Sequence, residues 1–187
     1  LKHNKYTYEF LAFGHFGKKS MGLLTAVKKN FKPKFQPYVL RTDKPRILRP
    51  FKNVRGLIST TLIIDEKSIS IVNTHLTYPR IHTIDMRKRE FVSLKDYLGT
   101  DSSAATFLCG DFNFLPFDGR RRYLKKYFAD FSGGVFKKTW KHSSKYSLLR
   151  ANPDYLFWND SRIKVDAKLA DFNTSDHRPL YAKIVII

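Results

Sequence analysis

The sequence predicts an α+β fold, a two-layer β-sandwich flanked by helices, on the basis of two main observations. First, apolar runs rich in β-branched and aromatic residues outnumber helical patterns along the 187 residues. Second, residues 57–64 and 69–75 are separated only by Asp65-Glu66-Lys67-Ser68, as in a hairpin. Because hairpins outnumber strand–helix–strand units, a layered sandwich is favoured over a doubly wound sheet.

The first fifty residues are predicted to form strands and extended segments. Residues 6–13 are an aromatic-rich run that ends at Gly14, and residues 21–27 are a second short apolar run. Residues 28–50 are basic and contain four prolines, which allow extended or edge segments and oppose helix.

Two helices are predicted among the later strands. Apolar residues recur at helical spacing over residues 84–98, and Gly99 marks the end of that pattern. We expect Arg87, Lys88 and Arg89 on the outer faces of this helix. Residues 119–128 predict a second helix with one apolar and one basic face. The remaining strands are predicted at residues 104–109, 155–158, 163–169 and 180–187.

Composition narrows the partners of the chain. The 35 Lys and Arg against 16 Asp and Glu give a net charge of +19, which implies a polyanionic partner, either nucleic acid or an anionic membrane surface. The single cysteine, Cys109, excludes an internal disulfide and is expected to be buried. No apolar stretch approaches the roughly 20 residues of a membrane span.

One monomeric domain over residues 1–187 is the default expectation. The default compartment is the cytoplasm, with secretion left open because the first residue is not Met.

Polar residues collect at the predicted strand ends. His75 ends one strand, Asp111 and Asn113 follow another, and Asp154 precedes a third. Each of these alone is also compatible with a turn or a structural residue. The adjacent Asp176 and His177 join a carboxylate to a potential general base directly ahead of the last strand.

At these strand ends the chain resembles the endonuclease/exonuclease/phosphatase superfamily of metal-dependent phosphodiesterases. The matching stretches, in the family's order, are Asn73-Thr74-His75-Leu76, Gly110-Asp111-Phe112-Asn113, Asp154-Tyr155-Leu156-Phe157 and Ser175-Asp176-His177-Arg178-Pro179-Leu180. The resemblance implies a deoxyribonuclease-like four-layer α/β/β/α architecture. The family's opening Asn and its metal-binding Glu have no counterpart. We therefore expect that the domain lacks its first strand–helix–strand segment, which leaves the activity of this chain open.

The resemblance also implies catalytic roles. His177 would be the general base that activates water, with Asp154 accepting its other ring proton. Asp111 and Asn113 would position the nucleophile and the scissile phosphate. His75 would donate a hydrogen bond to a non-bridging phosphate oxygen.

Metal and phosphate ligands follow from the same resemblance. Asp176 would help to hold a divalent ion, and Mg²⁺ suits oxygen ligands beside a phosphate, with Mn²⁺ as a second possibility. Basic side chains expected to contact substrate phosphates are Arg41, Arg46, Arg49, Arg120, Arg121 and Arg122.

The favoured function is therefore a nuclease that acts on DNA or RNA. A sphingomyelinase-like phospholipid phosphodiesterase stays open, because residues 112–117 are apolar enough to form a membrane-facing hairpin, although they could equally pack beneath the site. A third reading is a basic nucleic-acid-binding module without catalytic activity.

Overall fold

The computed structural model describes residues 5–16, 19–40, 55–78, 84–101, 103, 105–114, 118–131, 153–170 and 175–186. The described strands are β1 (Tyr6–Phe16), β2 (Lys19–Lys28), β3 (Lys34–Val39), β4 (Gly56–Ile64), β5 (Lys67–His75), β6 (Ala105–Asp111), β7 (Ala129–Phe131), β8 (Asp154–Trp158), β9 (Ile163–Leu169) and β10 (Leu180–Ile186). The helices are α1 (Ile84–Thr100), α2 (Gly119–Leu124) and a 3-10 turn at Lys29–Phe31. The predicted α+β class is confirmed.

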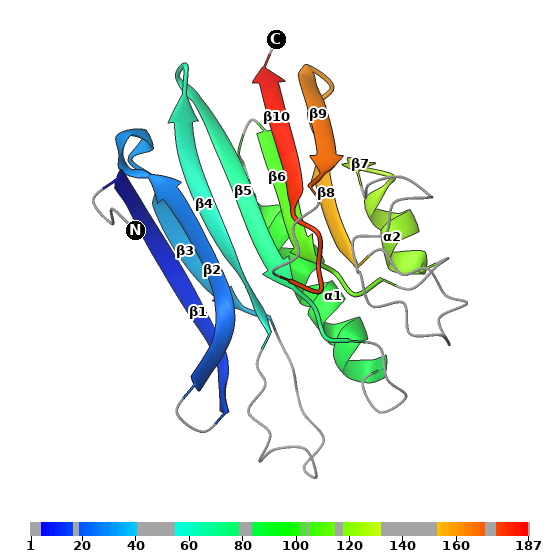
Figure 1. The fold of residues 1–187 in the computed structure, drawn as a ribbon. Coiled ribbons are helices and arrows are strands. Elements are labelled where there is room, and N and C mark those ends of the chain that lie inside the picture. Colours follow the sequence, from blue (N-terminus) through cyan, green and yellow to red (C-terminus); the bar gives the residue numbers. More distant parts are fainter. Residues whose placement is uncertain are drawn as a thin grey trace.

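A six-stranded mixed sheet forms the centre of the molecule (Figure 1), in the order β3-β4-β5-β6-β8-β7. Strands β5 and β6 run parallel, and the other neighbours run antiparallel. The β4–β5 hairpin turns at Asp65 and Glu66, both with positive φ, as the turn residues predicted. Pro37 lies in β3, at the edge of the sheet, where its missing N–H costs no internal ladder bond.

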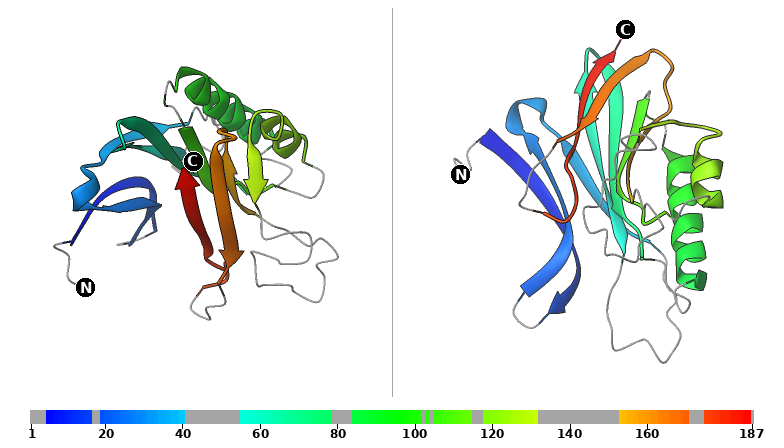
Figure 2. Two further views of the ribbon diagram at one scale, coloured as in Figure 1. Left: turned by 90° about the horizontal axis from the view of Figure 1, so that it is seen from above. Right: turned by 45° about the vertical axis from the view of Figure 1, so that its right-hand side comes forward.

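The two faces of the central sheet are covered differently. Figure 2 shows α1 and α2 on one face, and the two-stranded sheets β1–β2 and β9–β10 on the other. The described residues thus form three layers of the expected four, because both described helices lie on the same side. None of the described helices is long and apolar enough to cross a membrane.

Apolar side chains fill both spaces between layers. Between the helices and the sheet, the core includes Leu57, Leu94, Leu108, Phe112 and Phe157, all fully buried. A smaller cluster lies between the sheet and β9–β10, and consists of Ile69, Ala105, Phe107, Leu156 and Ile163. Successive residues of β6 alternate between these two clusters, as the period of a strand requires.

Residues 112–114 belong to the core. Phe112 and Phe114 are buried, and their ring centroids lie 5.2 Å apart. Phe112 also contacts the rings of Tyr155 and Phe157. This part of the apolar segment therefore packs beneath the strand ends and is not an exposed hairpin, whereas residues 115–117 lie outside the described residues.

Two details of the helices differ from the sequence prediction. Arg87 was expected on an outer face of α1 but is buried, because it shares a face with Phe91 and Leu94, four and seven residues later. Helix α2 ends at Leu124, and not at residue 128, since the chain turns there into the short strand β7 beside β8.

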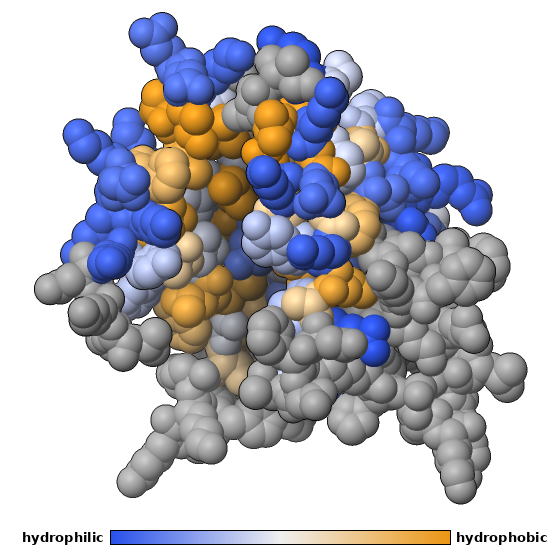
Figure 3. Space-filling view, turned by 45° about the horizontal axis from the view of Figure 1, so that its top comes forward, coloured by the Kyte–Doolittle hydropathy of each residue, from blue (hydrophilic) through white to orange (hydrophobic). Residues whose placement is uncertain are grey.

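A groove separates β2 from β10 on the sheet face opposite the helices. Its volume is about 620 Å³, and its walls include Leu24, Ile71, Leu156 and Ala182. Figure 3 shows apolar residues on both sides of this hollow, with hydrophilic residues around them. Cys109 lines the groove, so the cysteine that was expected to be buried is partly exposed, although desolvation raises the pKa of its thiol to about 11.

Gly110 is required by the close approach of β5 and β6. Its φ is +129°, and an added Cβ would overlap the Thr74 carbonyl oxygen. We expect Gly110→Ala to lower the free energy of unfolding by at least about 2 kcal/mol, since the strained backbone and the overlap add. Gly99→Ala is the control, because nothing lies within 4 Å of its Cβ position. Urea unfolding of both variants tests this, and equal stabilities would contradict it.

Candidate active site

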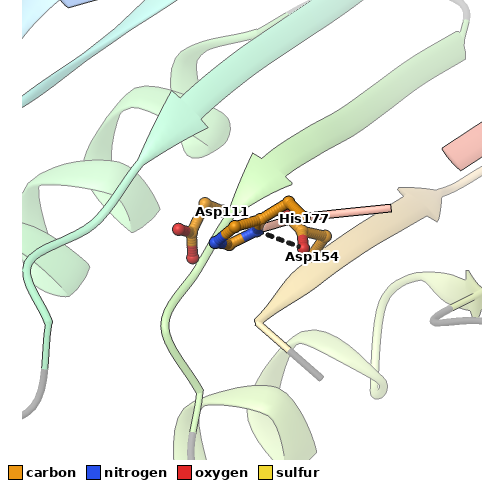
Figure 4. Close-up of side chains that lie close together, drawn as sticks. All are labelled: Asp111, Asp154 and His177. Carbon is orange, nitrogen blue, oxygen red and sulfur yellow. Dashed lines mark hydrogen bonds and ion pairs between the residues drawn. The ribbon is translucent and has the colours of Figure 1, made fainter. Parts of the chain in front are cut away.

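Three polar residues stand in one row at the ends of β5, β6 and β8. His75 is the register partner of Asp111, and Asp111 is the register partner of Asp154. His177, just before β10, joins them, and ligand atoms of Asp111, Asp154 and His177 all lie within 4.8 Å of one another. Figure 4 shows the His177 ring between the two carboxylates. The structure thus brings together four of the five predicted catalytic side chains in one cluster.

His177 and Asp154 form an oriented pair. The Nδ1 atom of His177 lies 2.8 Å from Oδ2 of Asp154 (Figure 4). The backbone N–H of His177 donates to the Ser175 hydroxyl at 3.1 Å. This hydrogen bond to Asp154 is the main cause that raises the pKa of His177. In the neutral ring, a proton held on Nδ1 leaves the Nε2 lone pair free to accept one.

Asp111 lies at the centre of the row. Burial, and then the negative charge of Asp154, raise the pKa of Asp111 to about 6. The Asn113 N–H donates to its Oδ1 at 2.9 Å, and the Nε2 atom of His75 lies 3.6 Å from its Oδ2. Asp111 is thus held in place, and its pKa lies closer to neutrality than that of an exposed aspartate.

His75 is a neutral imidazole at pH 7. Desolvation is the largest cause that lowers its pKa to about 4, followed by the charges of Arg55 and His177. Its ring packs edge-on against Phe13, at 6.0 Å between centroids. The Arg55 guanidinium lies over the same Phe13 ring, 5.3 Å from its centroid. A neutral His75 can donate a single N–H, as the predicted role requires.

Asn113 connects two strand ends. Its side chain is buried, and its Nδ2 donates to the Leu76 carbonyl at 2.9 Å. Its φ is +49°, the left-handed region that Asn tolerates better than most residues. Through these contacts Asn113 ties the segment after β6 to the segment after β5. Its predicted role in positioning the phosphate stays a prediction.

The predicted metal ligand and the described phosphate-binding arginines are not part of this cluster. Asp176 is exposed and does not belong to the three-residue group of potential metal ligands, although it adjoins His177. Arg120 pairs with Asp118 and Arg121 with Asp130, at 2.5 and 2.8 Å, whereas Arg122 is exposed. The other predicted arginines, Arg41, Arg46 and Arg49, lie outside the described residues.

A further basic residue, Arg55, lies near the site and was not among the predicted site residues. Arg55 directly precedes Gly56, which is the register partner of His75. Desolvation lowers the pKa of Arg55, while the charges of Glu90 and Asp111 oppose that shift. The hairpin predicted from the sequence could have indicated this position, because pairing its two strands sets Gly56, and so Arg55, opposite His75.

The cluster fits a divalent cation. Asp111 supplies carboxylate oxygens beside Asp154 and His177, and a bound cation would stabilise the ionised form of Asp111, which burial and then the charge of Asp154 disfavour. None of the chain's three glutamates belongs to the group found among the described residues. Glu66 lies in the β4–β5 turn, and Glu90 is fully buried on α1.

The chain resembles known proteins in its sequence and in its fold. Residues 1–177 match the sequence profile of the "Endonuclease/Exonuclease/phosphatase family". No curated protein matches the chain in sequence.

Solved structures resemble the whole fold at low sequence identity. An endonuclease/exonuclease/phosphatase family protein from Leptotrichia buccalis is 20% identical, with a TM-score of 0.68 over 98% of this chain and 73% of that one. The human Nocturnin catalytic domain with bound sulfate is 18% identical, with a TM-score of 0.71 over 99% and 74%. D. rerio TDP2 complexed with single-strand DNA product is 14% identical, with a TM-score of 0.68 over 98% and 78%. At these identities the likeness establishes the fold.

Proposed function

Because the chain belongs to the endonuclease/exonuclease/phosphatase family, we propose that it is a divalent-metal-dependent phosphodiester hydrolase in which His177 activates water. One observation carries the proposal. The Nδ1 atom of His177 is held by Asp154 at 2.8 Å, beside a second carboxylate on Asp111. A carboxylate, an oriented imidazole and a second carboxylate are the parts that a general base beside a metal site needs.

Each residue of the row then has a step to perform. Nε2 of His177 accepts the proton of the attacking water, and the Asp154 carboxylate holds the tautomer and stabilises the imidazolium that forms. The neutral His75 donates its N–H to a phosphate oxygen as negative charge develops there. Asp111, with the adjoining loop of Asp176, would hold Mg²⁺ or Mn²⁺, and the bound ion would neutralise charge on the scissile phosphate.

A nucleic acid is the substrate that charge favours. The chain carries a net charge of +19, and Arg122, Lys125 and Lys126 are exposed on and just after α2. Every neutralised phosphate releases counterions and strengthens binding at low salt. The D. rerio TDP2 structure of similar fold holds a single-strand DNA product. The phospholipid alternative loses part of its support, because Phe112 and Phe114 are buried.

The test compares substrates side by side. We expect the purified protein to nick plasmid DNA or cleave RNA in Mg²⁺, to lose that activity in EDTA, and to regain it on addition of Mg²⁺ or Mn²⁺. Nucleic-acid affinity should fall roughly tenfold or more between 50 and 200 mM salt. Hydrolysis of sphingomyelin alone would overturn the choice of substrate. Salt-dependent binding of nucleic acid without any cleavage would overturn the proposed enzymatic function and would support a binding module without catalytic activity.

A further inference from the structure

Helix α1 buries two charged side chains that the mechanism above does not use. Arg87 is 6% exposed and Glu90 is 0% exposed, and they lie one turn apart on the same face of the helix. Burial lowers the pKa of Arg87 to about 10 and raises the pKa of Glu90. Charged groups are costly to bury unless each has well-placed partners. The hydrogen-bond partners of Arg87 and Glu90 therefore indicate what these two side chains do in the fold.

Glu90 holds the segment that follows β5. Its Oε2 accepts from the Thr77 N–H at 2.9 Å, and its Oε1 accepts from the Thr77 hydroxyl at 2.5 Å. Thr77 lies two residues after His75 in the chain. The carboxylate thus holds Thr77, just beyond the predicted phosphate donor, by one hydrogen bond from its backbone and one from its side chain.

Arg87 holds the segment that follows β6. Its Nη2 donates to the Asn113 carbonyl at 2.7 Å and lies 3.6 Å from the Asp118 carboxylate. Asn113 is the left-handed residue whose N–H donates to Asp111. Arg87 therefore supports the Asp111 carboxylate indirectly, through Asn113.

The two sets of contacts close into a ring. Asn113 donates from its side chain to the Leu76 carbonyl, and Leu76 directly precedes Thr77. The backbone of Leu76 is also fixed by its N–H, which donates to the Asp111 carbonyl at 2.9 Å. One helical turn of α1 thereby sets the position of both strand ends relative to each other.

From this ring we infer that Arg87 and Glu90 are positioning residues of the active site, which hold His75 and Asp111 in register through Thr77 and Asn113. The inference rests on the proposed function. Neither residue touches the reacting atoms, so their effect should appear in the rate of the chemical step. A purely structural pair would lower stability and leave the rate of the folded protein unchanged.

The first test uses matched variants on α1. Arg87→Met keeps an unbranched apolar stem and removes the donors of the side chain. Arg87→Lys restores a charge and a donor. Glu90→Gln removes the charge of the acceptor that holds Thr77. Lys88→Met is the control, because its side chain is 73% exposed. We expect Arg87→Met to lower kcat about ten- to a hundredfold with KM within about twofold, and Arg87→Lys to recover part of that loss. Activities are compared well below each unfolding midpoint. An unchanged kcat in Arg87→Met would overturn the inference.

A second readout does not depend on activity. Hydrogen exchange of the Asn113 amide reports directly on its bond to Asp111. We expect Arg87→Met to speed that exchange about tenfold or more, while amides of the β9–β10 pair keep their wild-type rates. Unchanged Asn113 exchange would refute the positioning role even if the wild-type protein cleaved no substrate. An inactive wild-type protein would instead refute the proposed function, so the two failures are distinguishable.

Discussion

Replacing His177 by alanine is expected to lower kcat for phosphodiester cleavage by about 10³- to 10⁴-fold, at the upper end of the usual contribution of a general base. The Nε2 atom that accepts the proton of water is lost, and no described side chain replaces it at the Asp154 pair. Binding of nucleic acid should stay within about twofold of wild type, because long-range charge on the chain is almost unchanged.

This prediction is checked by single-turnover cleavage of a DNA or RNA oligonucleotide in Mg²⁺, beside a filter-binding measurement of affinity in EDTA. Lys183→Ala on β10 is the control, since its side chain is exposed and lies on the strand that follows His177. Full activity in His177→Ala would remove His177 from the mechanism. A loss of both cleavage and affinity would instead indicate a disrupted fold, which far-ultraviolet circular dichroism would detect.

The strand ends could be located from the sequence, but their register could not. Apolar runs give way to polar residues at His75, Asp111 and Asp154, and this change is visible in any single stretch. That the three residues are direct neighbours depends on pairing between strands far apart in the chain. Periodicity carries no information about such pairing, so it was the order of the family motifs that joined them.

The positioning role of Arg87 could not be predicted from the sequence, for a different physical reason. Arg87 was assigned to the surface because of its charge, although its spacing from Phe91 and Leu94 places it on the buried face of α1. Its partners, Asn113 and Asp118, lie on another segment of the chain. A buried charge is stable only where tertiary partners meet it, and those partners cannot be read from local sequence. Strand β7 was missed because three residues are too few to show alternation.

Replacing Asp154 by asparagine should separate the two effects of that carboxylate on His177. The rate at the plateau of the pH profile is expected to fall about 10²- to 10³-fold, because Asn can offer either a donor or an acceptor and no longer fixes the proton on Nδ1. The pKa of His177 should fall as well, since the hydrogen bond to Asp154 is what chiefly raises it. A base works in its unprotonated form. The acidic limb of the profile should therefore move to lower pH in the variant.

The measurement is kcat from pH 5 to 9 at saturating Mg²⁺, for wild type, Asp154→Asn and the control Asp166→Asn, which removes an exposed carboxylate on β9. A lower plateau with an acidic limb at the wild-type pH would show that Asp154 acts on something other than His177, such as the bound ion. A shifted limb with an unchanged plateau would show that the charge of Asp154 tunes the base without orienting it. Only the two changes together match a carboxylate that holds the His177 ring by Nδ1, as the 2.8 Å contact requires.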